Sequence, residues 1–247
     1  MQISNRRVRD SNSGIANGPH RLLPPDRSGS DTNRRALLAV NDRVTTMSEL
    51  ANASVRVRDD LIEMEARSFA ALAAPGDSLS GEERVALAEV ARGLDANGRL
   101  EEFARHLYSN PATVAAEHVR KAANDVGDPQ TVETIGIVAR LSALDRLHTV
   151  LGVDPEPLPT PQPGPATGKI TRGLKRRRGH VPMTPGPIPV SLDLIPSEAE
   201  AFQAMFGPLY MTEEQMGDPH FAREPGLNTP QLETIAARIS MFNECFY

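Results

Sequence analysis

Apolar residues recur every three or four positions along most of the chain, which is the spacing of one face of an α-helix. In residues 58–73 the apolar stripe includes Leu61, Met64 and Phe69. A longer stripe begins after Asp128-Pro129 and ends at Gly152. No segment alternates apolar and polar residues well enough to predict a strand. The pattern therefore predicts an all-α protein.

Capping residues mark where several of these helices begin. Ser80 and Glu83 have the spacing of a capping box, in which each side chain accepts a hydrogen bond from the other residue's backbone N–H group. Ser197 and Glu200 repeat that spacing and predict a second capping box. A polar residue followed by proline is another start signal. This signal predicts further helix starts at Asn110-Pro111, Asp128-Pro129 and Thr229-Pro230.

Two segments lack the helical pattern and divide the chain. Residues 1–33 are rich in Ser, Asn, Arg and Gly and are predicted to be a disordered leader, which an over-long start assignment would also explain. Residues 154–190 hold ten prolines, a density that predicts an extended linker. The sequence thus predicts one helical unit over 34–153 and a second over 191–247.

The linker carries a basic run that has two interpretations. Lys169, Arg172 and residues 175–178 gather positive charge there. A contact with nucleic acid or an acidic partner is one interpretation, and a solvated linker is the other. The absence of interleaved aromatic residues and the formal net charge of −5 favour the solvated linker. We therefore do not expect a nucleic-acid partner.

Composition narrows the location and the chemistry. The single cysteine and the lack of a signal-like apolar stretch near Met1 predict a reducing, cytoplasmic location. No apolar run approaches the length of a membrane span. His106, His118 and His148 are isolated from one another, so no metal motif is predicted. His148 shares a face with apolar residues and is predicted to be a hydrogen-bonded core or interface residue.

The last twenty-one residues contain the most specific pattern. Leu227, Glu233, Asn243 and Cys245 stand in the order and spacing of a redox helix. This stretch resembles the alkylhydroperoxidase and carboxymuconolactone decarboxylase-like family, whose helix reads Asn-x-Cys-x-x-Cys-x-x-x-His. The second cysteine of that motif would directly follow Tyr247. Because no helix stop signal precedes Tyr247 either, we expect the sequence to end inside the second redox helix.

The resemblance implies a fold and an activity. The fold would be an all-α helical bundle of the alkylhydroperoxidase-like type, with two units joined by the Pro-rich linker. The activity would be thiol-dependent reduction of a hydroperoxide by a dithiol donor, without metal or organic cofactor. Cys245 would be the resolving cysteine and Glu233 part of the proton relay. The family also implies self-association into a homo-oligomer, and a chain with one thiol is predicted to be inactive.

The first unit resembles a copy of the same motif without cysteines. Asn97, Gly98 and His106 keep the frame of the motif, while Arg99 and Glu102 stand where cysteines would be. Residues 133–153 resemble the closing helix of family members, although Asp145 replaces the usual Asn. Two alternatives stay open: a non-enzymatic helical interaction module, and a decarboxylase-like activity of family members that lack the cysteine pair.

Overall fold

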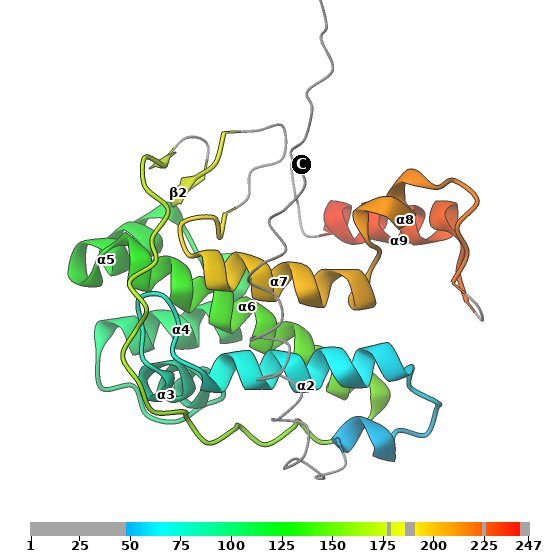
Figure 1. The fold of residues 1–247 in the computed structure, drawn as a ribbon, viewed down its shortest axis with the longest axis horizontal. Helices are drawn as coiled ribbons and strands as arrows, with labels where there is room; N and C mark the ends of the chain where they lie inside the picture. Colours follow the sequence, from blue (N-terminus) through cyan, green and yellow to red (C-terminus); the bar gives the residue numbers. More distant parts are fainter. Residues whose placement is uncertain (1–47, 177–178, 186–190, 224–225, 243–247) are drawn as a thin grey trace, which may run out of the picture. The chain divides into compact units, whose positions relative to one another are not determined.

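The computed structural model describes residues 48–176, 179–185, 191–223 and 226–242. Eight α-helices occur in these residues, with negligible strand content, which confirms the predicted all-α class (Figure 1). The helices are α2 (Asp59–Ala73), α3 (Gly81–Ala91), α4 (Arg99–Ser109), α5 (Ala116–Val126), α6 (Asp128–Leu151), α7 (Pro196–Leu209), α8 (Glu213–Gly217) and α9 (Thr229–Phe242). Short 3₁₀-helices cover Glu49–Asn52 and Pro111–Thr113.

Some predicted features lie outside the described residues. These are the leader over 1–33, the start of the first helical unit up to residue 47, and the positions Asn243 and Cys245. None of the helices in the described ranges combines the length and the apolar character that crossing a membrane requires.

α6 is the central helix of the bundle, because α2, α3, α4, α5 and α7 all pack against it. Its residues Ile137, Leu141 and Leu144 are each at most 2% exposed and belong to the main core cluster. Burying one such side chain stabilises the fold by about 1.5–3 kcal/mol. The helix begins at Asp128-Pro129 and ends at Gly152, as predicted, where a φ of 71° suits glycine.

The capping signals are confirmed at α3 and wrong at α7. Ser80 Oγ accepts from the Glu83 N–H at 3.3 Å, and Glu83 Oε2 accepts from the Ser80 N–H at 2.7 Å. α7 instead begins at Pro196, which places Ser197 inside the first turn. The Ser197 N–H donates to Asp77 Oδ2 at 2.8 Å. A distant carboxylate thus satisfies a donor that a local cap would have satisfied.

The helix predicted from Asn110-Pro111 also starts later than expected. Pro111–Thr113 forms a 3₁₀-helix, Val114 is extended, and α5 begins at Ala116. The Ala115 N–H donates to His118 Nδ1 at 2.9 Å and so satisfies one backbone donor at this start.

The Pro-rich segment lies in contact with the helices over its described part. The Gln162 N–H donates to the Ala73 carbonyl at 2.8 Å, and the Thr167 N–H donates to the Gly76 carbonyl at 2.8 Å. Farther along, the two-residue strands β1 (Lys175–Arg176) and β2 (Pro182–Met183) pair antiparallel. Sequence pattern did not predict this short pair.

α7 follows the Pro-rich segment in the chain and packs against α2 and α6 (Figure 1). Met205 of α7 is 3% exposed and joins the main core cluster. Residues from both sides of the Pro-rich segment therefore build one core. The division into two family units stays a prediction.

Candidate functional site

The predicted relay residue Glu233 lies in the second turn of α9, and its side chain is exposed. Cys245, the predicted resolving cysteine, lies outside the described residues.

The Tyr210 hydroxyl lies near the Glu233 carboxylate. Tyr210 caps the C-terminus of α7. Burial of the phenol and the nearby Glu233 carboxylate together raise the pKa of Tyr210 to about 12. Its hydroxyl therefore stays protonated at neutral pH and can donate to that carboxylate.

A second group of charged residues is buried inside the bundle. Arg84 of α3 and Arg140 of α6 both contact the Glu198 carboxylate of α7, and Arg84 also pairs with Glu133 of α6. The Arg84 Nη2–Glu198 Oε1 distance is 2.7 Å and the Arg140 Nη2–Glu198 Oε1 distance is 2.9 Å. All four side chains are at most 2% exposed. We call these four residues the ion cluster.

The ion cluster has two positive and two negative side chains, so its formal charge is balanced. Burial alone would lower the pKa of Arg84, but Glu198 and Glu133 outweigh it and raise that pKa. The second oxygen of Glu133 accepts from the Ser78 N–H at 2.6 Å and from the Ser78 hydroxyl at 2.7 Å. Charges that are paired and hydrogen-bonded in this way hold α3, α6 and α7 together.

Two glycines let the backbone approach the ion cluster. A Cβ atom on Gly136 would lie 2.4 Å from Glu198 Oε2, and one on Gly76 would lie 1.8 Å from Glu133 Oε1. Only glycine fits at such close approaches. The cluster is thus enclosed by backbone as well as by side chains, which suits a structural role more than binding of a substrate.

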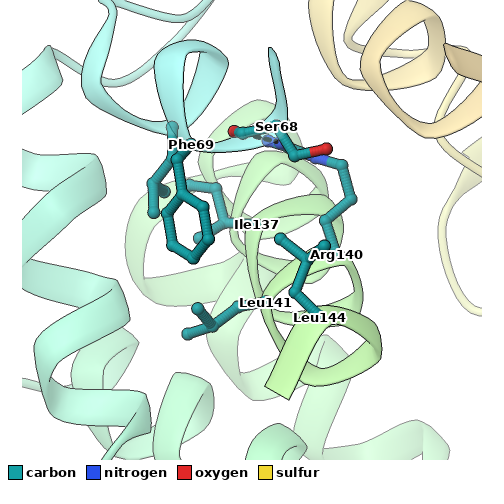
Figure 2. A pocket seen from close by; sticks show the side chains of 7 residues that line it. Ser68, Phe69, Ile137, Arg140, Leu141 and Leu144 are labelled. Atoms are coloured by element: carbon teal, nitrogen blue, oxygen red, sulfur yellow. Dashed lines mark hydrogen bonds between the residues drawn. The ribbon is translucent and has the colours of Figure 1, made fainter. Parts of the chain in front are cut away.

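A small cavity lies beside the ion cluster, between α2 and α6 (Figure 2). Arg140 and Ser68 form its polar side, and Phe69 and Leu144 are among its apolar lining residues. Arg140 Nη1 donates to the Ser68 carbonyl at 3.3 Å. The volume of this cavity, about 10 Å³, is at the lower limit for one water molecule and is too small for an organic hydroperoxide.

A further buried group joins α2, the end of α6 and the start of the Pro-rich segment. Glu65 and His148 are each 1% exposed, and Glu156 is half-buried. His148 Nε2 contacts Glu65 Oε1, and His148 Nδ1 lies 2.5 Å from the Asp154 carbonyl oxygen. The donor atoms of Glu65, His148 and Glu156 all lie within 4.8 Å of one another. We call these three residues the Glu-His-Glu cluster.

Burial opposes protonation of His148, but the hydrogen bonds with Glu65 and the Asp154 carbonyl outweigh it and raise its pKa above the usual value. The sequence prediction that His148 is a hydrogen-bonded core residue is confirmed. Its partners were not predicted, because Glu65 is 83 residues away along the chain.

The positions that resemble the family motif in the first unit form ordinary contacts. Arg99 starts α4 and pairs with Asp125 at 2.8 Å on the surface. Asp145, which replaces the usual Asn, accepts from Arg92 Nη2 at 2.6 Å and from the Tyr108 hydroxyl at 2.5 Å. These interactions support packing among the helices.

A pattern in the sequence could have revealed the two buried groups. Glu133, Arg140 and His148 lie on the apolar face of α6 beside Ile137 and Leu141, where charged residues are rare unless paired. Three charged or titratable positions on a core face thus predict buried partners without identifying them. Comparison with family models, curated proteins and solved structures found no match to this chain.

Proposed function

We propose that α9 is the redox helix of a thiol-dependent hydroperoxide reductase resembling the alkylhydroperoxidase-like family. The observation that carries this proposal is that Glu233 is exposed on α9, with the phenol of Tyr210 nearby. The spacing from Glu233 to Cys245 matches the family motif and supports the same assignment. The interior of the bundle supplies the scaffold and takes no part in the chemistry.

The reaction needs two thiols. The thiolate of the motif's second cysteine attacks the terminal oxygen of the hydroperoxide, the O–O bond breaks, and the leaving alkoxide takes a proton to become an alcohol. Glu233 is the residue that relays this proton. The Cys245 thiol then attacks the resulting sulfenic acid, water leaves, and a disulfide forms. An external dithiol reduces that disulfide and is itself oxidised.

The test compares the 247-residue chain with a longer chain that adds Cys-x-x-x-His and a closing helix after Tyr247. The probes are cumene hydroperoxide and dithiothreitol. We expect turnover only in the longer chain, because the printed sequence holds one cysteine. In the longer chain, Glu233→Gln should lower kcat by about 10²-fold, while Glu200→Gln on the exposed side of α7 should not. Turnover that survives both Cys245→Ser and Glu233→Gln would contradict the proposal.

A second candidate function, association of two copies of this chain through α9, rests on a separate observation. Ile235, Ile239 and Phe242 stand at helical spacing on α9 and are 46%, 53% and 69% exposed within the described residues. Spaced i, i+4 and i+7, they form one apolar stripe. A stripe of this kind is buried when two identical helices pack together.

Light scattering after size exclusion tests this association. The wild-type chain should elute as a dimer or larger oligomer, and Ile239→Glu should yield a monomer. Thr234→Glu adds the same charge at an exposed position off the apolar stripe and should leave the oligomer intact. A monomeric wild-type chain would reject the association while leaving the redox proposal standing.

A further inference from the structure

The Glu-His-Glu cluster has a composition that its role in packing does not require. Two carboxylates, Glu65 and Glu156, face one imidazole, that of His148, and the atoms that could bind a metal lie within 4.8 Å of one another. A simple buried ion pair would need only one carboxylate. The cluster therefore has an excess of negative charge at a site that is mostly shielded from water.

The hydrogen bond at His148 Nδ1 fixes the orientation of the imidazole ring. His148 Nδ1 lies 2.5 Å from the Asp154 carbonyl oxygen, which can only accept, so Nδ1 carries the proton. Nε2 donates to the Glu65 carboxylate, and loss of that proton would give Nε2 a lone pair for a cation in the same direction. A backbone carbonyl that holds the far nitrogen is the arrangement that orients histidine ligands of metals.

The two carboxylates are also held in place by hydrogen bonds from one segment. The Ser48 hydroxyl donates to Glu65 Oε2 at 2.5 Å, and the Glu49 N–H donates to Glu156 Oε2 at 2.9 Å. Each contact occupies one carboxylate oxygen, and the other Glu65 oxygen contacts His148 Nε2, so a cation would replace that contact. Glu156 is half-buried, which gives a cation access from solvent on that side.

The Arg92 guanidinium, which contacts the backbone of Glu156, does not neutralise the cluster. Arg92 Nη1 donates to the backbone carbonyl of Glu156 at 2.8 Å, while its Nε and Nη2 atoms bind the Asp145 carboxylate. Its charge is therefore matched by Asp145. A cation that takes the place of the proton between His148 Nε2 and Glu65 would be bound by one imidazole and two carboxylates.

We propose that Glu65, His148 and Glu156 bind a divalent transition-metal cation of the Zn²⁺ type. Imidazole nitrogen with carboxylate oxygen suits such a cation better than Mg²⁺, which prefers oxygen ligands. Ligand bonds of about 2.0–2.1 Å place donor atoms roughly 3.4 Å apart in a tetrahedron. The Glu65 oxygen therefore moves off His148 Nε2 to admit the cation, and Glu156 closes toward it. Water completes the coordination.

The bound cation would link four segments of the chain. Its ligands come from α2, from the last turn of α6 and from the Pro-rich segment, and the 3₁₀-helix Glu49–Asn52 supports the carboxylates. This site stabilises the fold and is separate from the redox chemistry proposed for α9. Whether this site binds a cation is therefore independent of whether α9 is a redox helix.

The experiment is isothermal titration calorimetry of the chelator-treated 247-residue chain with ZnCl₂ alone, in a Cys245→Ser background that removes the one thiol. We expect one Zn²⁺ per chain, release of protons that rises as the pH falls, and a higher melting temperature with the cation. Glu156→Gln and His148→Gln should each weaken binding at least about tenfold. Glu63→Gln changes an exposed residue and His118→Gln a half-buried residue outside the cluster, and neither should weaken binding.

Circular dichroism verifies that each variant is folded, and Glu156→Gln keeps the test valid if a buried substitution fails to fold, because Glu156 is half-buried. Absence of stoichiometric Zn²⁺ binding in the wild-type chain would overturn the proposal. So would binding that Glu156→Gln and His148→Gln leave unchanged, since the cation would then be on the surface. Mg²⁺ binding of equal affinity would overturn the assignment of a nitrogen ligand.

Discussion

Single residues of the ion cluster decide how α7 attaches to the rest of the bundle. Glu198 is the only carboxylate that both Arg84 and Arg140 contact in the described part of the chain, and it is fully buried. The arginines lie on α3 and α6, while Glu198 lies on α7. Removing its charge would leave two buried guanidinium groups with one carboxylate between them.

Glu198→Gln should therefore lower the free energy of unfolding by about 3–5 kcal/mol. The matched control is Glu200→Gln, which makes the same change on an exposed residue of α7 and should have little effect. Urea unfolding followed by circular dichroism measures both. Equal stability of the two variants would show that the ion cluster does not hold α7.

Tyr108 is a single residue that makes the stability of the fold depend on pH. Burial and the hydrogen bond to Asp145 raise its pKa to about 12, against an ordinary value of 10.0. The folded protein then binds more protons than the unfolded chain between about pH 10 and 12, so stability falls as pH rises through this range. In Tyr108→Phe that alkaline loss should be smaller, and the late-ionising component of an ultraviolet absorbance titration, which Tyr210 shares, should fall from two tyrosines to one. An unchanged titration curve would contradict the Tyr108–Asp145 contact.

The helices themselves could largely be predicted from sequence, because their signals are local. α2, α6 and the start of α9 follow from apolar spacing and from a proline after a polar residue. The start of α7 could not be predicted in the same way. The Ser197 N–H donates to the carboxylate of Asp77, 120 residues away in the sequence. The residues around Ser197 carry no pattern from which this distant acceptor could be predicted.

The two predicted capping boxes give a direct comparison at the scale of elements. Ser80→Ala should cost about 1 kcal/mol, because it removes a cap that the structure contains. Ser197→Ala should cost little, because the buried Ser197 Oγ has no hydrogen-bond partner among the described residues. Thermal unfolding of the two variants measures the difference. If Ser197→Ala lowered the stability more than Ser80→Ala does, the result would support the capping box that the sequence predicts at Ser197.

The candidate sites were predictable only where their residues lie close together in sequence. Glu233 and the spacing to Cys245 could be recognised because they belong to one short stretch. Arg84 and Glu198 meet across 114 residues, so only the fold reveals the ion cluster. The same holds for Glu65 and His148. A single sequence shows that a charged residue lies on an apolar helix face. It does not show which distant residue of opposite charge pairs with it.

In the molecule as a whole, α2, α3, α4, α6 and α7 share the main core, to which both sides of the Pro-rich segment contribute. α6 provides its centre, the ion cluster attaches α7, and the Pro-rich segment follows the helices through backbone hydrogen bonds. α9, by contrast, exposes an apolar stripe and the side chain of Glu233. The exposure of these α9 side chains is what the redox and the association proposals both require.

The most direct test of the redox proposal is to locate the disulfide formed in one reaction cycle. The longer chain, with the cysteine added three positions after Cys245, is reduced, freed of dithiol and mixed with one equivalent of cumene hydroperoxide. Peptide mass spectrometry then identifies the bonded sulfurs. We predict an intramolecular disulfide between Cys245 and the added cysteine, formed more slowly in Glu233→Gln. Thiols that stay reduced, or that pair only between chains, would contradict the assignment of α9 as a redox helix.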